Sequence, residues 1–161
     1  MPYRFEYANK ADTESILPEC FHLFYENMRE IASLGTYDDE FAAWYSEVCP
    51  ALRKTPRQIV LMYDTEKFIG FFQYYVRGGE LVMEEIQISR EYHGSGIFCE
   101  FYTWLVEALP RDLEFVRAYT HHSNTRSQGI LCHLGLSTSD SSGEFIEFRG
   151  EYAKIREKYI M

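Results

Sequence analysis

A short glycine-containing run in the middle of the chain has the composition of a turn that binds anions. It consists of Tyr92, His93, Gly94, Ser95, Gly96 and Ile97. Glycine tolerates left-handed backbone conformations, so such a turn can point successive peptide N–H groups toward one spot. A helix that begins directly after the turn would add its positive N-terminal end. The run therefore predicts a site in which backbone amides bind phosphate oxygens.

Two other phosphate-binding loops do not fit this run. A dinucleotide-binding fingerprint requires a third glycine, and Cys99 stands at that position. A P-loop requires four residues between its glycines and then a lysine, whereas only Ser95 separates Gly94 from Gly96. A pair of glycines is a weak signal by itself, so its meaning depends on the elements around it.

The turn is predicted to lie between a strand and a helix. Leu81–Ile88 is rich in apolar and β-branched residues and leads into a loop over 89–95. Beyond the turn, Phe98, Phe101 and Leu105 keep the spacing of one helical face. This order places the glycines at the start of the helix, where an anion site requires them.

The remaining segments predict an α/β (α+β) fold. Further strands are predicted at Tyr3–Tyr7, Ile59–Tyr63, Phe68–Val76, Phe115–Thr120, near Leu136 and at Phe145–Phe148. Two early helices are predicted, one with apolar residues from Leu17 to Ile31 and one that begins at Asp38 and is stopped by Pro50. A later helix is capped by Asn124 and ended by Gly135, and Glu151–Tyr159 is a further candidate.

The composition predicts one domain over residues 1–161. A chain of 161 residues with 46% hydrophobic side chains can close one core and is too short for two ordinary domains. Its net charge of -9 argues against nucleic acid as a partner. No stretch approaches the roughly 20 apolar residues that cross a bilayer, and no secretory signal is seen. We therefore expect a cytoplasmic protein with no membrane partner.

The turn and its flanking elements resemble the GCN5-related N-acetyltransferase superfamily. That family carries a Q/R-x-x-G-x-G/A loop after its fourth strand, and residues 93–98 match it in register. About thirty residues on, Asn124, Ser127 and the ending at 134–136 resemble the family's Asn-led helix. The clear resemblance covers Leu81–Leu136. It implies a mixed, mostly antiparallel sheet of six or seven strands flanked by about four helices, with a splay between strands four and five.

The resemblance also implies how acetyl-coenzyme A would bind. The backbone groups of Ile86, Gln87 and Ile88 would pair with the pantetheine like an added strand. The pyrophosphate would be held by the amides of His93, Gly94, Ser95, Gly96, Ile97 and Phe98, with Asn124 and Ser127 as further contacts. Acetyl-CoA would be the co-substrate and an amine the acceptor. A homodimer is an assembly that the family likeness allows.

Three residues depart from the family pattern. His93 replaces the usual Gln or Arg, and Phe98 stands where Gly or Ala is common. Leu131 occupies the position where many members carry a tyrosine that protonates the departing thiolate. The thiolate would then take its proton from water, from Tyr119 or from His133.

Two carboxylates on the predicted fourth strand, Glu84 and Glu85, are candidates for a catalytic base. An amine with a pKa near 10.4 costs roughly 4 to 5 kcal/mol to deprotonate at neutral pH, so a base is useful. Glu84 aligns with an acidic residue found in polyamine-type members of the family, so it is the first candidate for the base. Strand alternation would place the two on opposite faces, so only one would reach the acceptor. Carboxylates that are simply exposed on a strand explain either residue equally well.

A metal site is not predicted. His121 and His122 are adjacent and would point to opposite sides of a strand, whereas zinc needs three or four converging ligands. Cys132 and His133 cannot form a nucleophilic pair, because neighbours on a helix do not face each other. The four cysteines have no C-x-x-C spacing, which favours free buried thiols.

These patterns predict an N-acetyltransferase that moves an acetyl group from acetyl-CoA to a primary amine of a small molecule or peptide. Attack would be direct, with Glu84 or Glu85 as base. One alternative is a catalytically weak or inactive acyl-CoA-binding module, because Leu131 replaces the family's usual acid. Another is a structural or interaction domain in which Gly94 and Gly96 form an ordinary turn.

Overall fold

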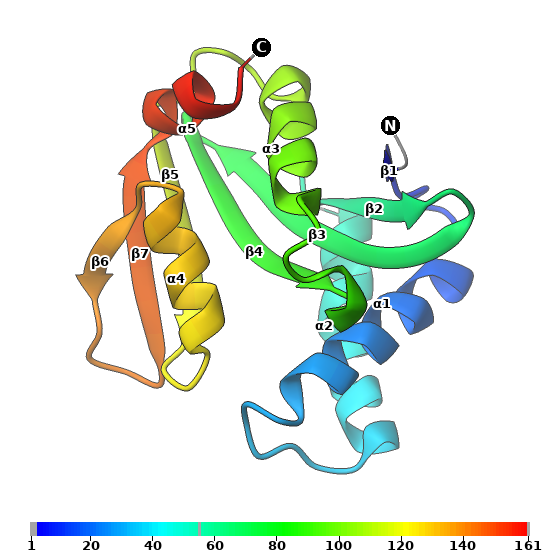
Figure 1. The fold of residues 1–161 in the computed structure, drawn as a ribbon. Coiled ribbons are helices and arrows are strands. Elements are labelled where there is room, and N and C mark those ends of the chain that lie inside the picture. Colours follow the sequence, from blue (N-terminus) through cyan, green and yellow to red (C-terminus); the bar gives the residue numbers. More distant parts are fainter. Residues whose placement is uncertain (1–2, 55, 161) are drawn as a thin grey trace. The chain divides into compact units, whose positions relative to one another are not determined.

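The structure, a computed structural model, describes residues 3–54 and 56–160 (Figure 1). The chain forms two compact units. The first takes its residues from 1–73 and 85–95, and the second from 74–84 and 96–161. Because two strands contribute residues to both units, the expectation of one domain over 1–161 stays a prediction.

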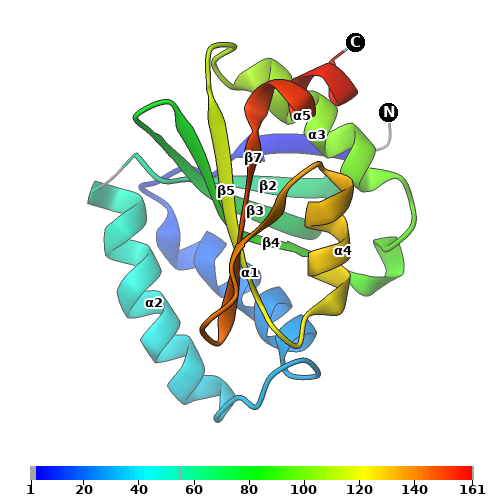
Figure 2. The same cartoon turned by 90° about the vertical axis from the view of Figure 1, so that its left-hand side faces the viewer.

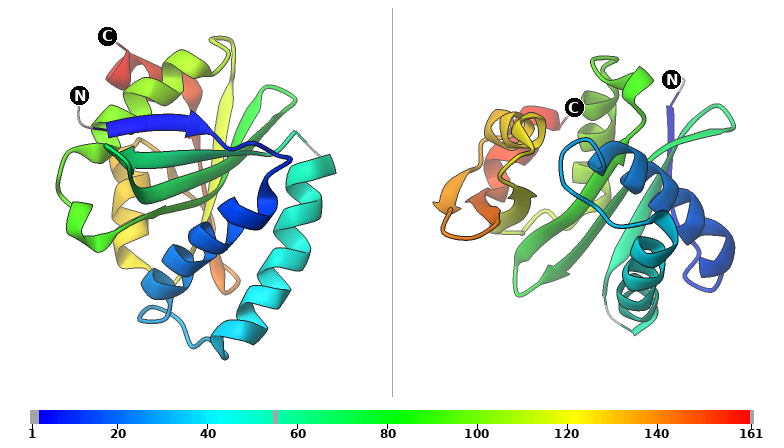
Figure 3. Two further views of the ribbon diagram at one scale, coloured as in Figure 1. Left: turned by 90° about the vertical axis from the view of Figure 1, so that its right-hand side faces the viewer. Right: turned by 90° about the horizontal axis from the view of Figure 1, so that it is seen from below.

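The first unit contains two long helices that pack against a strand pair. Its elements are β1 (Tyr3–Tyr7), α1 (Thr13–Met28), α2 (Tyr37–Lys54), β2 (Gln58–Asp64), the first part of β3 (Lys67–Arg77), the last part of β4 (Glu80–Ile88) and the 3-10 turn η1 (Arg90–Tyr92). Helices α1 and α2 lie side by side (Figure 3). Leu17 and Cys20 of α1 share one core cluster with Leu52 of α2 and Ile59 and Leu61 of β2. The apolar spacing that predicted these helices is therefore the spacing of their buried faces.

The prediction that Pro50 ends the second helix is wrong. Helix α2 continues through Pro50 to Lys54. A proline inside a helix removes one hydrogen bond and costs about 3 kcal/mol. The turn that follows, however, carries Leu52, which is buried in the core cluster. Arg53 in the same turn donates a 2.9 Å hydrogen bond to the hydroxyl of Thr13. These contacts hold the last turn in helical form.

The second unit covers one face of its strands with helices. Its elements are the remaining parts of β3 and β4, α3 (Ile97–Ala108), β5 (Phe115–His121), α4 (Thr125–His133), β6 (Ser137–Asp140), β7 (Phe145–Glu151) and α5 (Tyr152–Tyr159). Helix α4 runs beside β5 (Figure 2). Along β5, Val116 and Ala118 are buried, whereas Phe115 and Tyr119 are exposed. This alternation is that of a strand with one covered face and one open face.

The strands follow the order β1-β2-β3-β4-β5-β7-β6. The pairs β1 with β2, β5 with β7, and β6 with β7 are antiparallel, and β4 with β5 is parallel. Within residues 3–54 and 56–160 there are seven strands and five α-helices. The predicted mixed, mostly antiparallel sheet of six or seven strands is confirmed. The fifth helix is α5, which comes from the charged segment at 151–159.

The parallel pairing of β4 with β5 is short. It joins Glu80 to Phe115 at one end and Met83 to Ala118 at the other, so four residues of each strand take part. A pairing that stops at this point is what the predicted splay of strands four and five requires.

The cysteines divide into two classes. Cys20 and Cys49 are buried, and burial raises the pKa of the Cys20 thiol. Cys99 and Cys132 are exposed, so the prediction of buried thiols is wrong for these two. Cys132 lies on the outer side of α4, whose buried residue is Leu131.

Across the part of the chain that the structure describes, every helix is too short or too polar to span a bilayer.

Candidate functional site

The glycines of the predicted anion-binding turn adopt the left-handed conformation. Gly94 has φ of 78° and Gly96 has φ of 86°. Gly96 is also the residue that precedes the first turn of α3. A Cβ built at either glycine would meet no atom within 4 Å. These glycines are thus required by backbone conformation, and the space beside them is open.

Four backbone amides of this turn have no acceptor in the part of the chain that the structure describes. The N–H of His93 donates to the C=O of Arg90, and the N–H of Ser95 donates to the C=O of Tyr92 at 3.2 Å. Among the described residues, none accepts from the N–H groups of Gly94, Gly96, Ile97 and Phe98. The last two are in the first turn of α3, where a helix leaves its N–H groups unpaired. Of the six amides predicted to bind phosphate oxygens, four therefore have an N–H group that is not already used within the turn.

The 3-10 turn before the glycines is anchored to the β2–β3 hairpin. The hydroxyl of Tyr92 donates a 2.7 Å hydrogen bond to Asp64, which raises the pKa of Tyr92 to about 12. Lys67 forms an ion pair with Glu91. The hydroxyl of Ser95 donates to the C=O of Tyr92 at 2.6 Å. The backbone that precedes Gly96 is therefore fixed by side chains as well as by its own hydrogen bonds.

Two carbonyl groups at the end of β4 lie close to other atoms of the protein. The C=O of Ile88 accepts from the side-chain amide of Asn27 at 3.1 Å, and Nε2 of His93 lies 3.1 Å from the same oxygen. The C=O of Gln87 lies over Gly70, where an added Cβ would be 2.7 Å from it. Of the predicted ligand-pairing residues 86–88, the carbonyls of two are thus already in close contact with the protein.

The side chain of Gln87 connects α1 to Glu85. Gln87 is only 8% exposed, and its carbonyl oxygen accepts a 2.9 Å hydrogen bond from Asn27. Its amide donates a 2.5 Å hydrogen bond to Oε1 of Glu85. Gln87 was predicted for its backbone, and the role of its side chain was missed. The carboxylate of Glu85 is therefore held on the side of β4 that carries α1.

The last part of β4 lies beside the first part of β3. The N–H of Ser89, directly after β4, donates to the C=O of Ile69 at 2.8 Å. The expectation that Glu84 and Glu85 lie on opposite faces of β4 stays a prediction.

The residues predicted around α4 have structural roles. Oδ1 of Asn124 accepts a 3.0 Å hydrogen bond from the N–H of Ser127 and caps the helix. Leu131 is buried. Contacts of Asn124 and Ser127 with a co-substrate stay predictions. Of the two side chains considered as proton donors, Tyr119 is exposed on β5 beside Arg117, and His133 is exposed at the end of α4.

The histidines do not gather into a metal site in the described part of the chain. His121 pairs with Glu144 at 3.3 Å. No group of three or more His, Cys, Asp or Glu residues with the spacing of metal ligands occurs among residues 3–54 and 56–160.

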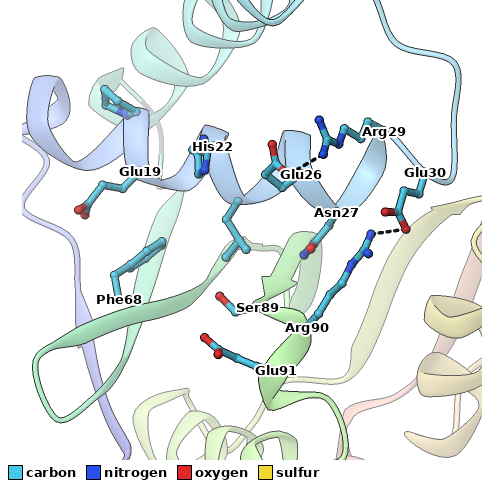
Figure 4. Close-up of a pocket in the computed structure, with 12 residues that line it drawn as sticks. Glu19, His22, Glu26, Asn27, Arg29, Glu30, Phe68, Ser89, Arg90 and Glu91 are labelled. Atoms are coloured by element: carbon cyan, nitrogen blue, oxygen red, sulfur yellow. Dashed lines mark ion pairs between the residues drawn. The ribbon is translucent and has the colours of Figure 1, made fainter.

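A pocket of about 840 Å³ lies within the first unit, along α1 (Figure 4). One wall is α1 and the residues that follow it, and the other is formed by the start of β3 and the segment around η1. The lining residues are Pro18, Glu19, His22, Leu23, Glu26, Asn27, Arg29, Glu30, Phe68, Ser89, Arg90 and Glu91. Sequence reasoning missed this pocket, because three separate segments supply its walls and none carries a motif.

No protein-family model and no curated protein sequence matches the chain. Solved structures do match it. The PaiA N-acetyltransferase of Thermoplasma acidophilum in complex with coenzyme A is 14% identical, with a TM-score of 0.71 over 94% of this chain and 100% of that one. An aminoglycoside N(6')-acetyltransferase of Legionella pneumophila is 14% identical, with a TM-score of 0.69 over 98% and 96%. A variant of the spermidine N-acetyltransferase SpeG of Vibrio cholerae is 13% identical, with a TM-score of 0.63 over 98% of both chains.

At these identities the likeness shows the fold. The chain has the fold of the GCN5-related N-acetyltransferases, as the resemblance at residues 93–98 predicts.

Proposed function

We propose that this protein is an N-acetyltransferase that transfers an acetyl group from acetyl-CoA to a primary amine of a small molecule or peptide. The observation that carries the proposal is the set of unpaired amides at Gly94, Gly96, Ile97 and Phe98. It supports binding of a diphosphate, because such amides at a helix start attract negatively charged oxygen. The fold shared with N-acetyltransferases supports the acyl-transfer chemistry.

The reaction needs a base and a proton donor. The amine nitrogen attacks the thioester carbonyl carbon, the carbon–sulfur bond breaks, and the thiolate takes up a proton. The amine must first lose its own proton, which costs roughly 4 to 5 kcal/mol at neutral pH for a lysine-like amine. We place Glu85 before Glu84 as the base, because Gln87 fixes the Glu85 carboxylate. Attack is direct in this proposal, since no nucleophile paired with a base is found among residues 3–54 and 56–160.

Leu131 favours a second candidate, an acyl-CoA-binding module with little or no activity. The family's usual tyrosine is replaced by this buried leucine. In the enzyme, water protonates the thiolate, with Tyr119 and His133 as further candidates. The cytoplasmic location and the homodimer stay predictions from the sequence.

An amine panel tests the proposal. The protein is incubated with acetyl-CoA and, in turn, polyamines, amino acids and peptides, and the acetylated products are measured by mass spectrometry. This readout is chosen because Cys99 and Cys132 would react with a thiol reagent. We expect product only when protein and a particular class of amine are both present.

Two other outcomes would count against the N-acetyltransferase. A thermal shift with acetyl-CoA but no product from any amine would favour the binding module. A missing shift at saturating acetyl-CoA would contradict both candidates, because a ligand at 100 times its Kd stabilises a protein by about 2.7 kcal/mol.

A further inference from the structure

The pocket along α1 combines an apolar floor with acidic walls. Leu23 and Phe68 are partly buried against the core cluster, and Pro18 is a further apolar residue of the lining. Glu19 of α1 and Phe68 of β3 lie at one end of the pocket, and Glu30 and Arg90 lie at the other (Figure 4). A volume of about 840 Å³ is that of a site for a small organic molecule.

The basic groups around the pocket are already paired. Arg29 forms an ion pair with Glu26, and Arg90 forms one with Glu30. The fourth acidic residue of the lining, Glu91, pairs with Lys67. Within the described residues, Glu19 forms no ion pair. The lining therefore carries four carboxylates against two guanidinium groups, and it has the charge that attracts a cation.

Two of these carboxylates are spaced along one face of α1. Glu19 and Glu26 are seven residues apart, so two turns of helix separate them by roughly 10 Å along the axis. His22 lies between them on the same face. The ion pair of Glu26 with Arg29 is exposed, and such pairs contribute little, so an ammonium group can compete for Glu26.

We propose that this pocket binds a linear organic dication, with one ammonium group at Glu19, the other at Glu26 and an aliphatic chain over Leu23 and Phe68. Gly94 and Gly96 are not among the residues that line the pocket. Asn27 belongs both to the pocket wall and to the hydrogen bonds that lead through Gln87 to Glu85. The pocket therefore shares one wall residue with the hydrogen bonds that hold Glu85.

Calorimetry with three simple amines tests whether the two ammonium groups must match the distance between Glu19 and Glu26. The full-length protein, without acetyl-CoA, is titrated with 1,8-diaminooctane, 1,4-diaminobutane and octylamine. The eight-carbon diamine has about the length that separates Glu19 from Glu26, the shorter diamine cannot span it, and octylamine has one charge only. We expect one binding site per chain, and an affinity for the long diamine that is about three- to fivefold above those of the other two.

Substitutions identify the site. Glu19→Gln and Glu26→Gln should each remove the advantage of the long diamine over octylamine. Glu47→Gln is the matched control, because Glu47 is an exposed glutamate on α2 that does not line the pocket, and it should leave this advantage unchanged. Equal affinities for the three amines, or an equal loss in all three variants, would overturn the proposal. The result is independent of acetyl transfer, because no acyl donor is present in the titration.

Discussion

The side-chain amide of Gln87 donates a 2.5 Å hydrogen bond to the carboxylate of Glu85. The same amide is held in turn by Asn27 of α1. A buried amide that is satisfied on both sides keeps one orientation, because turning it would leave polar atoms unpaired. The carboxylate of Glu85 is thus connected, through Gln87, to a helix more than fifty residues away in the sequence.

Replacing Glu85 by Gln should lower the acetylation rate strongly. Loss of a positioned base lowers turnover by about 100-fold or more. The loss should be largest at low pH, where fewer amines are deprotonated without help, and it should shrink as the pH rises toward the pKa of the amine. Affinity for acetyl-CoA should stay within about twofold of the wild type, since the diphosphate contacts are elsewhere. Rates are measured by mass spectrometry across the pH range.

The Glu84→Gln variant, which removes the neighbouring carboxylate, is the comparison for Glu85→Gln. We expect it to lower the acetylation rate less than Glu85→Gln does. If Glu84→Gln alone abolished turnover, Glu84 would be the base, as the sequence resemblance suggests. Unchanged rates in both variants would remove the two residues from the mechanism.

Replacing Gly70 by Ala should destabilise the protein. The added Cβ would lie 2.7 Å from the carbonyl oxygen of Gln87, which is backbone and cannot move aside cheaply. Such overpacking costs about 1 to 3 kcal/mol, measured as a lower urea midpoint. Gly129→Ala is the control, because Gly129 is inside α4 and an added Cβ meets nothing within 4 Å. It should raise stability by up to about 1 kcal/mol. A neutral Gly70→Ala would show that β3 and β4 separate readily.

Replacing Gly96 by Ala should weaken acetyl-CoA binding. Its φ of 86° is unfavourable for alanine by about 1 to 2 kcal/mol, so the turn shifts and its amides lose their alignment. We expect an increase of about tenfold in Kd by calorimetry, the size that corresponds to such an energy. Gly78→Ala has a similar strain in the β3–β4 turn, with φ of 57°. If both variants weakened binding equally, strain alone would explain the loss.

Most elements of the fold follow from local patterns, and the exceptions have tertiary causes. Alternation predicts the first strand and the hairpin, and apolar spacing predicts the helix after Gly96. Pro50 led to a wrong prediction of the end of α2. The buried Leu52 beyond it stabilises a helical turn that the proline disfavours. The exposure of Cys132 was missed for a similar reason, since only packing decides which residues of α4 face inward.

The candidate site was only partly accessible to sequence reasoning. The turn at Gly94 and Gly96 could be predicted, because its conformation depends on residues that are adjacent in the chain. The sequence did not show which N–H groups of the turn already donate to a carbonyl of the protein, as that of Ser95 does. Only the backbone hydrogen bonds of the structure show this. The contact of Asn27 with Gln87 and the pocket along α1 join segments far apart in the sequence, so no local pattern indicates them.

Reaction with a thiol reagent should distinguish two pairs of cysteines. Cys99 and Cys132 are exposed and should react with Ellman's reagent in the native protein at mildly alkaline pH. Cys20 and Cys49 are buried, and the raised pKa of Cys20 keeps its thiol protonated, so both should react only after denaturation. Rapid reaction of all four thiols without denaturant would contradict the packing of α1 and α2 in the first unit.

The most direct measurement of the central claim is the amide spectrum of the ¹⁵N-labelled protein during titration with acetyl-CoA. The account predicts that the resonances of Gly94, Gly96, Ile97 and Phe98 move most, because their N–H groups gain charged acceptors. The amides of His93 and Ser95, which already donate within the turn, should move less. Saturable binding that leaves these four resonances in place would contradict the account.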